Sequence, residues 1–273
     1  MGAPGGLTSW RVVGASVPGL AHTADGTPCQ DAHAIAHVGD WLVAAVCDGA
    51  GSSSRAGLGA AVGAQALVDG LGEACQDASA RAGDGRDDES RDLDAWTEVA
   101  ARAVERARTA IGEALVAEGE AADLSLAHTT LVACALGPVG GALFHIGDGL
   151  ATALGPDGAI VSPPENGAFA NETFFLTEPE WAAHLRTTVV PGPVESVWLL
   201  SDGAAALATS GGALLQGFAD PVSTFLSGST TVDGTAALRD TLASSATAHL
   251  TDDDKTIVWA APTGGDATPR VAP

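Results

Sequence analysis

The chain has 273 residues, 46% hydrophobic and 17% charged, a composition that predicts a folded protein and excludes a wholly disordered one. Lysine and arginine together number 12, aspartate and glutamate 34, and the formal net charge is −22. Because nucleic-acid affinity comes largely from basic side chains that neutralise phosphates, we expect no nucleic-acid partner. No window of the sequence approaches the roughly 18 consecutive apolar residues that a membrane helix needs, so we expect no membrane association.

The cysteines are scattered and include no Cys-x-x-Cys pair. This spacing suits neither a zinc site nor a disulfide framework, so we expect free thiols in a reducing environment. The first residues also lack the basic and then apolar layout of a secretory signal. These features predict a cytoplasmic protein.

The first half of the chain reads as strands followed by helices. Strands are predicted at Trp10–Val17, Ala34–Val38 and Trp41–Cys47. An Ala-rich helix is predicted from about Ser54, then a solvated loop at Asp77–Asp94 and a second helix at Trp96–Val116.

The second half returns to strands and ends with a helix and a strand. Strands are predicted at Thr129–Leu136, Gly141–Ile146, Leu150–Leu154, Thr187–Val190, Ser196–Leu200 and Thr256–Ala261, with a helix at Thr235–His249. Because strands and helices do not alternate regularly, we expect an α+β fold of two packed, mainly antiparallel sheets flanked by helices. Residues 8–261 are expected to form one domain, and residues 262–273 a disordered tail.

Aspartates stand at the edges of several predicted strands. Asp48 ends a buried strand, Asp202 ends another, and Asp31 and Asp253 each precede one. Carboxylates that converge at strand ends repel one another unless a cation joins them, and ligands that are all oxygen suit Mg²⁺ or Mn²⁺. A single Asp-Gly is nevertheless more often a turn than a ligand, and a turn suffices to explain Asp148-Gly149.

Six stretches carry a resemblance to one family. They are CQDA at 29–32, AAVCDGAGS at 44–52, HTTLVACAL at 128–136, FHIGDG at 144–149, LLSDGAAAL at 199–207 and DDKTIVWA at 253–260. In this order, over about residues 10–261, the sequence resembles the metal-dependent (PPM-type, type 2C) serine/threonine protein phosphatases. PPENGAFANETFFLT at 163–177 is similar to a bacterial subgroup of that family.

The resemblance implies a centre of two Mn²⁺ or Mg²⁺ ions. In that centre Asp48 bridges both ions and the Gly49 carbonyl binds one of them. Asp31 is a ligand or holds the attacking water. Asp202 and Asp253 complete the coordination of the other ion.

Two further assignments come from the family's spacing. Asp253 is preferred to Asp252 or Asp254 because it stands three residues before Thr256, as in the family's Asp-x-x-Thr. Asp123 lies shortly before HTTL, where bacterial members place a ligand for a possible third ion.

The chain also departs from the family at two places. Some members carry a histidine, a candidate general acid, at the position of Ala50, so a metal-bound water or another histidine has to serve here. The family's phosphate-binding arginine is also missing, because no arginine lies between Arg11 and Asp31. His22 and Arg55 are the candidates for contact with the substrate phosphate.

The resemblance implies a serine/threonine phosphoprotein phosphatase in which a metal-bridging water attacks phosphorus directly, with no protein nucleophile. Its substrates are then phosphoserine and phosphothreonine proteins, and a bacterial serine/threonine kinase opposes it. Two alternatives stay open: a catalytically weak phosphoprotein-binding protein, and a two-metal hydrolase of small phosphoesters.

Overall fold

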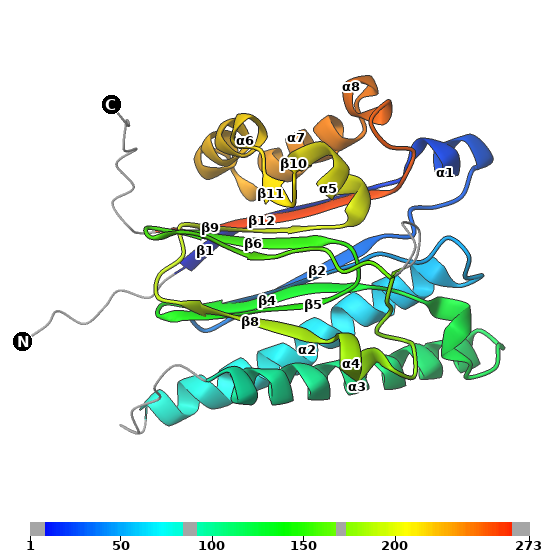
Figure 1. Ribbon diagram of the computed structural model, residues 1–273, viewed down its shortest axis with the longest axis horizontal. Helices are drawn as coiled ribbons and strands as arrows, with labels where there is room; N and C mark the ends of the chain where they lie inside the picture. Colours follow the sequence, from blue (N-terminus) through cyan, green and yellow to red (C-terminus); the bar gives the residue numbers. More distant parts are fainter. Residues whose placement is uncertain (1–8, 84–91, 168–172, 264–273) are drawn as a thin grey trace, which may run out of the picture.

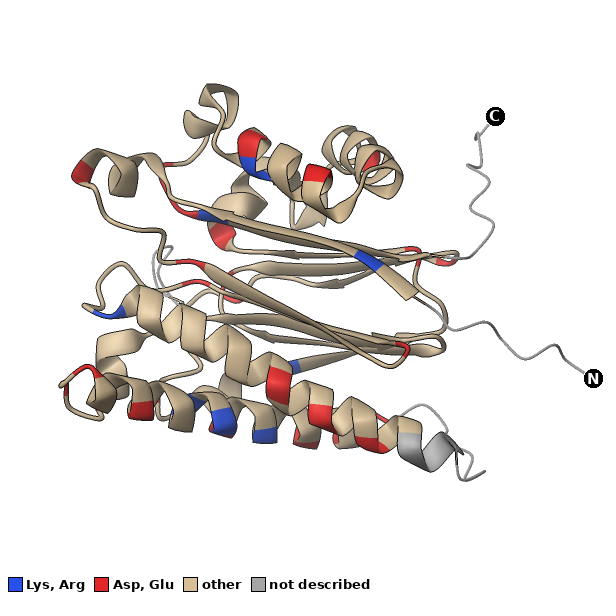
Figure 2. Cartoon of the chain, turned by 180° about the vertical axis from the view of Figure 1, so that it is seen from behind, with Lys and Arg blue, Asp and Glu red and all other residues tan. Residues whose placement is uncertain are grey.

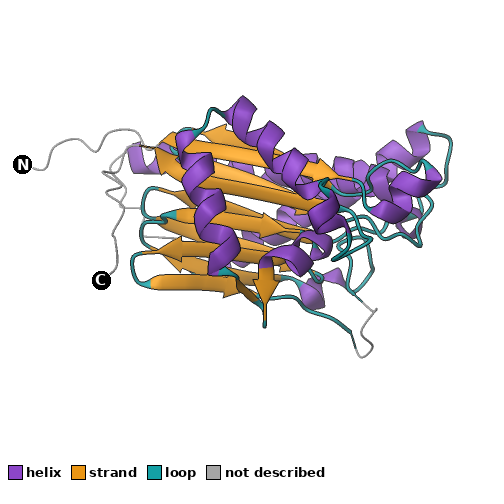
Figure 3. Ribbon diagram, turned by 90° about the horizontal axis from the view of Figure 1, so that it is seen from above, coloured by secondary structure: helices purple, strands orange, loops and turns teal. Residues whose placement is uncertain are grey.

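Residues 9–83, 92–167 and 173–263 are described by the computed structural model, in which two antiparallel sheets stack between layers of helices (Figures 1 and 3). One sheet has the order β1 (Ser9–Val17), β12 (Lys255–Thr263), β9 (Ser196–Leu200), β6 (Leu150–Gly155) and β7 (Gly158–Ser162). The other has the order β2 (Ala32–Val38), β3 (Trp41–Cys47), β4 (Leu131–Gly137), β5 (Gly140–Ile146) and β8 (Arg186–Pro191). A short hairpin joins β10 (Thr209–Ser210) to β11 (Ala213–Leu214). The predicted fold class is confirmed.

Helices α2 (Ala56–Gly83) and α3 (Leu93–Ala117) cover the outer face of one sheet, and α5 (Asp202–Ala208), α6 (Gln216–Gly228) and α7 (Thr231–Leu242) cover that of the other. The shorter helices of the described residues are α1 (Leu20–Asp25), α4 (Trp181–His184) and α8 (Ser245–Ala248), with a 3₁₀ turn η1 (Leu124–Ala127). In the part of the chain that the structure describes, no helix is both long and apolar enough to cross a bilayer.

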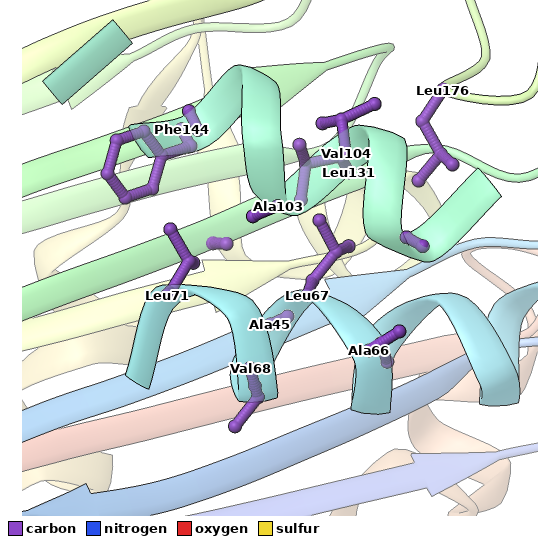
Figure 4. Close-up of a cluster of buried hydrophobic side chains, with 14 of the residues drawn as sticks. Ala45, Ala66, Leu67, Val68, Leu71, Ala103, Val104, Leu131, Phe144 and Leu176 are labelled. Atoms are coloured by element: carbon purple, nitrogen blue, oxygen red, sulfur yellow. The ribbon is translucent and has the colours of Figure 1, made fainter. Parts of the chain in front are cut away.

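Strand β3 shows why the layers form. Its side chains are almost all buried, yet they alternate between two different cores, as the two-residue repeat of a strand requires. Leu42 and Val46 lie between the sheets, where they belong to one core with Leu199 of β9. Val43 and Ala45 face the α2–α3 layer, and Figure 4 shows the side chains of that core around Ala45.

The opposite face of the first sheet has its own core. Trp198 of β9 and Trp259 of β12 pack with side chains from the C-terminal helices, including Leu207 and Leu238. Both tryptophans are fully buried. Apolar contacts therefore hold the strands on both faces, which leaves the strand ends as the place for polar chemistry.

Several predicted boundaries differ from the structure. Helix α2 continues through Asp77 to Gly83, because its Ala-rich repeat extends into the charged segment, and the predicted loop was wrong over that part. The rest of that loop, 84–91, lies outside the described residues. Strand β12 includes Pro262 and Thr263, which pair with β1, so the predicted tail begins too early, and its remainder lies outside the described residues. The predicted helix at Thr235–His249 is interrupted between α7 and α8.

Candidate metal centre

Three carboxylates meet at one end of the sandwich. Asp48 directly follows β3, Asp148 lies two residues after β5, and Asp202 lies two residues after β9. One carboxylate oxygen from each of the three lies within 4.8 Å of the other two. Figure 2 shows acidic segments gathered at these strand ends. Both sheets contribute to the cluster, so the packing of the sheets against each other sets its geometry.

Asp31 is the most deeply buried of the predicted carboxylate ligands. It directly precedes β2 and is 6% exposed. The Ser201 hydroxyl donates a hydrogen bond of 2.6 Å to its Oδ2 atom, and Ser201 Oγ accepts one of 2.9 Å from the Thr256 amide. Ser201, next to Asp202, therefore orients Asp31, and Thr256 near the start of β12 in turn holds Ser201.

The HTTL motif fixes the backbone of Asp48. The Asp48 carbonyl accepts hydrogen bonds of 2.9 Å from the Thr129 hydroxyl and from the Thr130 amide. The Asp48 amide donates to Thr130 Oγ1 at 3.1 Å. At Gly49, a side chain has no room, because an added Cβ would lie 2.6 Å from the Gln30 carbonyl oxygen. Close backbone packing therefore fixes the position of Gly49 and requires a residue without a side chain there.

Burial and mutual repulsion make these carboxyl groups hard to ionise. Desolvation, with repulsion from Asp254 and Asp202, raises the pKa of Asp31 to about 7 despite the hydrogen bond from Ser201. Desolvation and repulsion from Asp202 raise the pKa of Asp148 to about 6. The pKa of Asp48 is raised well above its ordinary value, first by desolvation and then by repulsion from Asp31 and Asp202. A cation at this end would relieve that repulsion.

Asp253 and Asp254 are adjacent but have different surroundings. Asp253 has an exposed side chain, and desolvation and repulsion from Asp202 raise its pKa. An added Cβ on Gly203 would lie 3.1 Å from the Asp253 Cβ, so this residue borders the cluster. Asp254 is 2% exposed and accepts hydrogen bonds from the Gly19 and Gln30 amides.

The other predicted site residues lie outside the group of three aspartates. His22 Nδ1 lies 2.8 Å from Asp254 Oδ1. The Arg55 guanidinium donates to Glu120 Oε1 at 2.6 Å, and its Nε lies 3.6 Å from Glu118 Oε2, so its charge is already paired. Asp123 is exposed and accepts a hydrogen bond from the Ser125 amide before η1, and it is not part of the described three-aspartate cluster.

Asp148 is the cluster residue that the sequence analysis assigned to a turn. The sequence did contain a signal that Asp148 is a site residue, because Asp148-Gly149 follows the buried strand β5 much as Asp48-Gly49 follows β3. The glycine is needed for packing, since an added Cβ on Gly149 would lie 2.5 Å from the Leu200 carbonyl oxygen. The frequency of Asp-Gly in turns hid this similarity.

The donor set fits hard divalent cations. Among the described residues, Asp31 Oδ1 and Asp202 Oδ1 are buried oxygens without a hydrogen-bond partner. Such oxygens are costly to bury unless a cation or a proton satisfies them. The group of three that the described residues form consists of aspartates alone, and such a donor set favours Mg²⁺ or Mn²⁺ over zinc.

Comparison with known proteins places the chain among phosphatases. The family model "Protein phosphatase 2C" matches residues 18–243. Serine/threonine-protein phosphatase 3 of Escherichia coli (strain K12) is 30% identical over 208 residues, which are 73% of this chain and 76% of that protein.

Solved structures share the fold. PppA, described as a key regulatory component of T6SS in Pseudomonas aeruginosa, aligns with a TM-score of 0.57 at 16% identity over 94% of this chain and 99% of its own. The catalytic domain of the serine threonine protein phosphatase PstP, in complex with two manganese ions, aligns with a TM-score of 0.53 at 16% identity, over 94% of this chain and 100% of its own. The chain therefore belongs to the protein phosphatase 2C family, a family of protein serine/threonine phosphatases.

Proposed function

We propose that this chain is a metal-dependent phosphatase that removes phosphate from phosphoserine and phosphothreonine in proteins. The observation that carries the proposal is the convergence of Asp48, Asp148 and Asp202 from two sheets onto one small volume. Membership of the phosphatase family and the likeness to an enzyme named as a serine/threonine phosphatase support the choice of substrate.

Two Mn²⁺ or Mg²⁺ ions are the proposed cofactors, held by Asp48 with the Gly49 carbonyl, and by Asp31, Asp202 and Asp253. When bound, such ions lower the pKa of a coordinated water and offset charge on phosphoryl oxygens. The protein presents Asp48 on a backbone clamped by the HTTL threonines, so this carboxylate keeps its place against the repulsion of its neighbours.

The remaining carboxylates have supporting roles in the proposal. Asp31, oriented by the Ser201 hydroxyl, keeps Oδ1 free to hold a ligand or the attacking water. Asp148 adds a further carboxylate beside Asp48 and Asp202, and we propose it as an additional ligand. A third ion at Asp123 stays a prediction, as does a phosphate contact by His22 or Arg55.

The cellular setting is proposed on the same basis. The four cysteines, Cys29, Cys47, Cys75 and Cys134, are free thiols, which supports a reducing cytoplasm. A protein that removes phosphate from serine and threonine has to be opposed by a kinase for these residues, and we propose a bacterial one.

The test is manganese-dependent release of phosphate from phosphoserine and phosphothreonine peptides. We expect turnover by the unaltered protein and a loss of at least about 1,000-fold in Asp48→Asn and in Asp202→Asn, because each removes a ligand charge without changing side-chain volume. Asp69→Asn, at an exposed position on α2, is the matched control and should keep full activity.

Other outcomes would contradict the proposal in distinct ways. Binding of manganese and of phosphopeptide without turnover would indicate a phosphoprotein-binding protein. Turnover confined to small phosphoesters such as p-nitrophenyl phosphate would indicate a small-molecule hydrolase.

A further inference from the structure

The Asp254 carboxylate, just before β12, is hydrogen-bonded to residues in and around α1, beside the proposed metal centre. It is 2% exposed, and it accepts hydrogen bonds of 2.6 Å from the Gly19 amide and 2.5 Å from the Gln30 amide. Its third partner is the Nδ1 atom of His22 at 2.8 Å. Because both oxygens of Asp254 accept from backbone amides, the carboxylate is held as an acceptor, and His22 presents a proton on Nδ1 to it.

The backbone places His22 at the rim of the aspartate cluster. Helix α1, which carries His22, begins against the loop before β12, because an added Cβ on Gly19 would lie 2.1 Å from the Asp252 carbonyl oxygen. The partner of His22, Asp254, directly follows Asp253, the proposed ligand, in the chain. The His22 side chain is 23% exposed, so a ligand can reach it.

The orientation of the ring leaves one nitrogen for chemistry. Since Nδ1 is bound to Asp254, Nε2 is the ring nitrogen left to act on a substrate. A carboxylate that fixes one imidazole nitrogen and stabilises the imidazolium is the arrangement by which histidine acts as an acid or base in other hydrolases. The position at which some relatives carry a histidine is Ala50 here, so a histidine that acts as the acid has to come from elsewhere in the chain.

Resting on the proposed phosphatase function, we propose that His22 is a catalytic residue that protonates the leaving serine or threonine oxygen, with Asp254 as its positioning residue. The oxygen of the attacking water forms a new bond to phosphorus, and the bond from phosphorus to the ester oxygen breaks. The Nε2 proton passes to that ester oxygen, which leaves as an alcohol. The product is hydrogen phosphate, and the second proton of the water restores the imidazolium through solvent.

Leaving groups of different basicity test this role. A serine alkoxide needs a proton to leave, whereas p-nitrophenolate is a stable anion and does not. For His22→Gln we expect kcat on a phosphoserine peptide to fall about 100-fold, and kcat on p-nitrophenyl phosphate to fall less than about threefold. Asp254→Asn should show the same selective pattern with a smaller loss. His37→Gln, on the exposed part of β2, is the matched control and should retain both activities.

Two further measurements separate this role from a structural one. The affinity of His22→Gln for Mn²⁺, measured by calorimetry, should equal that of the unaltered protein. Added imidazole should partly restore peptide turnover in His22→Ala. An equal loss on both substrates would overturn the proposal and indicate a phosphate contact instead, and unchanged kcat on the peptide would also overturn it. If the unaltered protein turned over neither substrate with Mn²⁺, the proposed function itself would fail.

Discussion

The same strands form two opposite environments: an apolar space between the sheets and a cluster of aspartates at one end of them. Between the sheets, Leu42 and Leu199 are fully buried among apolar neighbours, so burial there is favourable. At the strand ends, a few residues away, Asp31 and Asp48 are brought together against their repulsion. The apolar middle thus supplies the stability with which the fold holds carboxylates that would otherwise separate.

The largest effect on stability is expected from the apolar side of this comparison. Leu199→Ala should lower the free energy of unfolding by about 3 kcal/mol, because it leaves a cavity between the sheets. Urea denaturation measures the change. Leu250→Ala, at a position that is 55% exposed, is the control and should change stability by less than about 0.5 kcal/mol. Similar losses in both variants would show that the centre of the sandwich is not its main source of stability.

At the acidic end, removing a carboxylate should raise the stability of the protein rather than lower it. In metal-free protein Asp31 keeps its proton up to a pH of about 7, whereas the ordinary value of an aspartate is 3.8. The folded state therefore binds more protons between these pH values, and its stability falls as the pH rises through them. We expect Asp31→Asn to be more stable than the unaltered protein by on the order of 2 kcal/mol at pH 7.

Thermal and urea unfolding in EDTA, followed from pH 4 to pH 7.5, measures this difference. The advantage of Asp31→Asn should shrink as the pH approaches 4, where both folded proteins carry a neutral group at this position. Asp69→Asn serves as the control, and its difference from the unaltered protein should not vary in this way. A variant that is less stable at pH 7 in EDTA would show that the carboxylates are not under strain.

The smallest effect is expected on the exposed helices. Arg106 Nη1 lies 2.7 Å from Glu73 Oε1, but the two side chains are 44% and 65% exposed, so water screens the pair. Glu73→Gln should lower the free energy of unfolding by only about 0.3 kcal/mol, with a still smaller effect in 0.5 M salt. Denaturation at two salt concentrations measures it. A loss above about 1 kcal/mol would mean that this ion pair, unlike most exposed pairs, helps to hold α2 against α3.

Much of the layered fold could be predicted because its strands are short apolar runs bounded by turns. Trp41–Cys47 and Ser196–Leu200 were predicted with the bounds of β3 and β9. Helix α1 was missed because it has six residues, none of them buried, and therefore no apolar repeat to detect. It forms where it does because Gly19 packs against a loop that lies more than 230 residues further along the chain.

The candidate site was predictable only in part. Asp48 and Asp202 were predicted as ligands because they end buried strands, and the structure brings them together. Asp148 also follows a buried strand, but its Asp-Gly pair was attributed to a turn. The different surroundings of Asp253 and Asp254 depend on contacts with Gly19 and other distant residues, and no local pattern within an Asp-Asp-Asp run encodes such contacts.

The pairing of β1 with β12 has a consequence for the newly made protein. Ser9 pairs with Thr263, so β1, the first described strand to be synthesised, can pair only after β12, the last one, has been made. On the ribosome, α2, α3 and the second sheet can assemble earlier, while Asp254 and its contact with His22 can form only once the segment leading into β12 has been made. The hydrogen bonds of Asp254 therefore form after the rest of the described fold, and a truncation that removes β12 would also remove the pairing partner of β1.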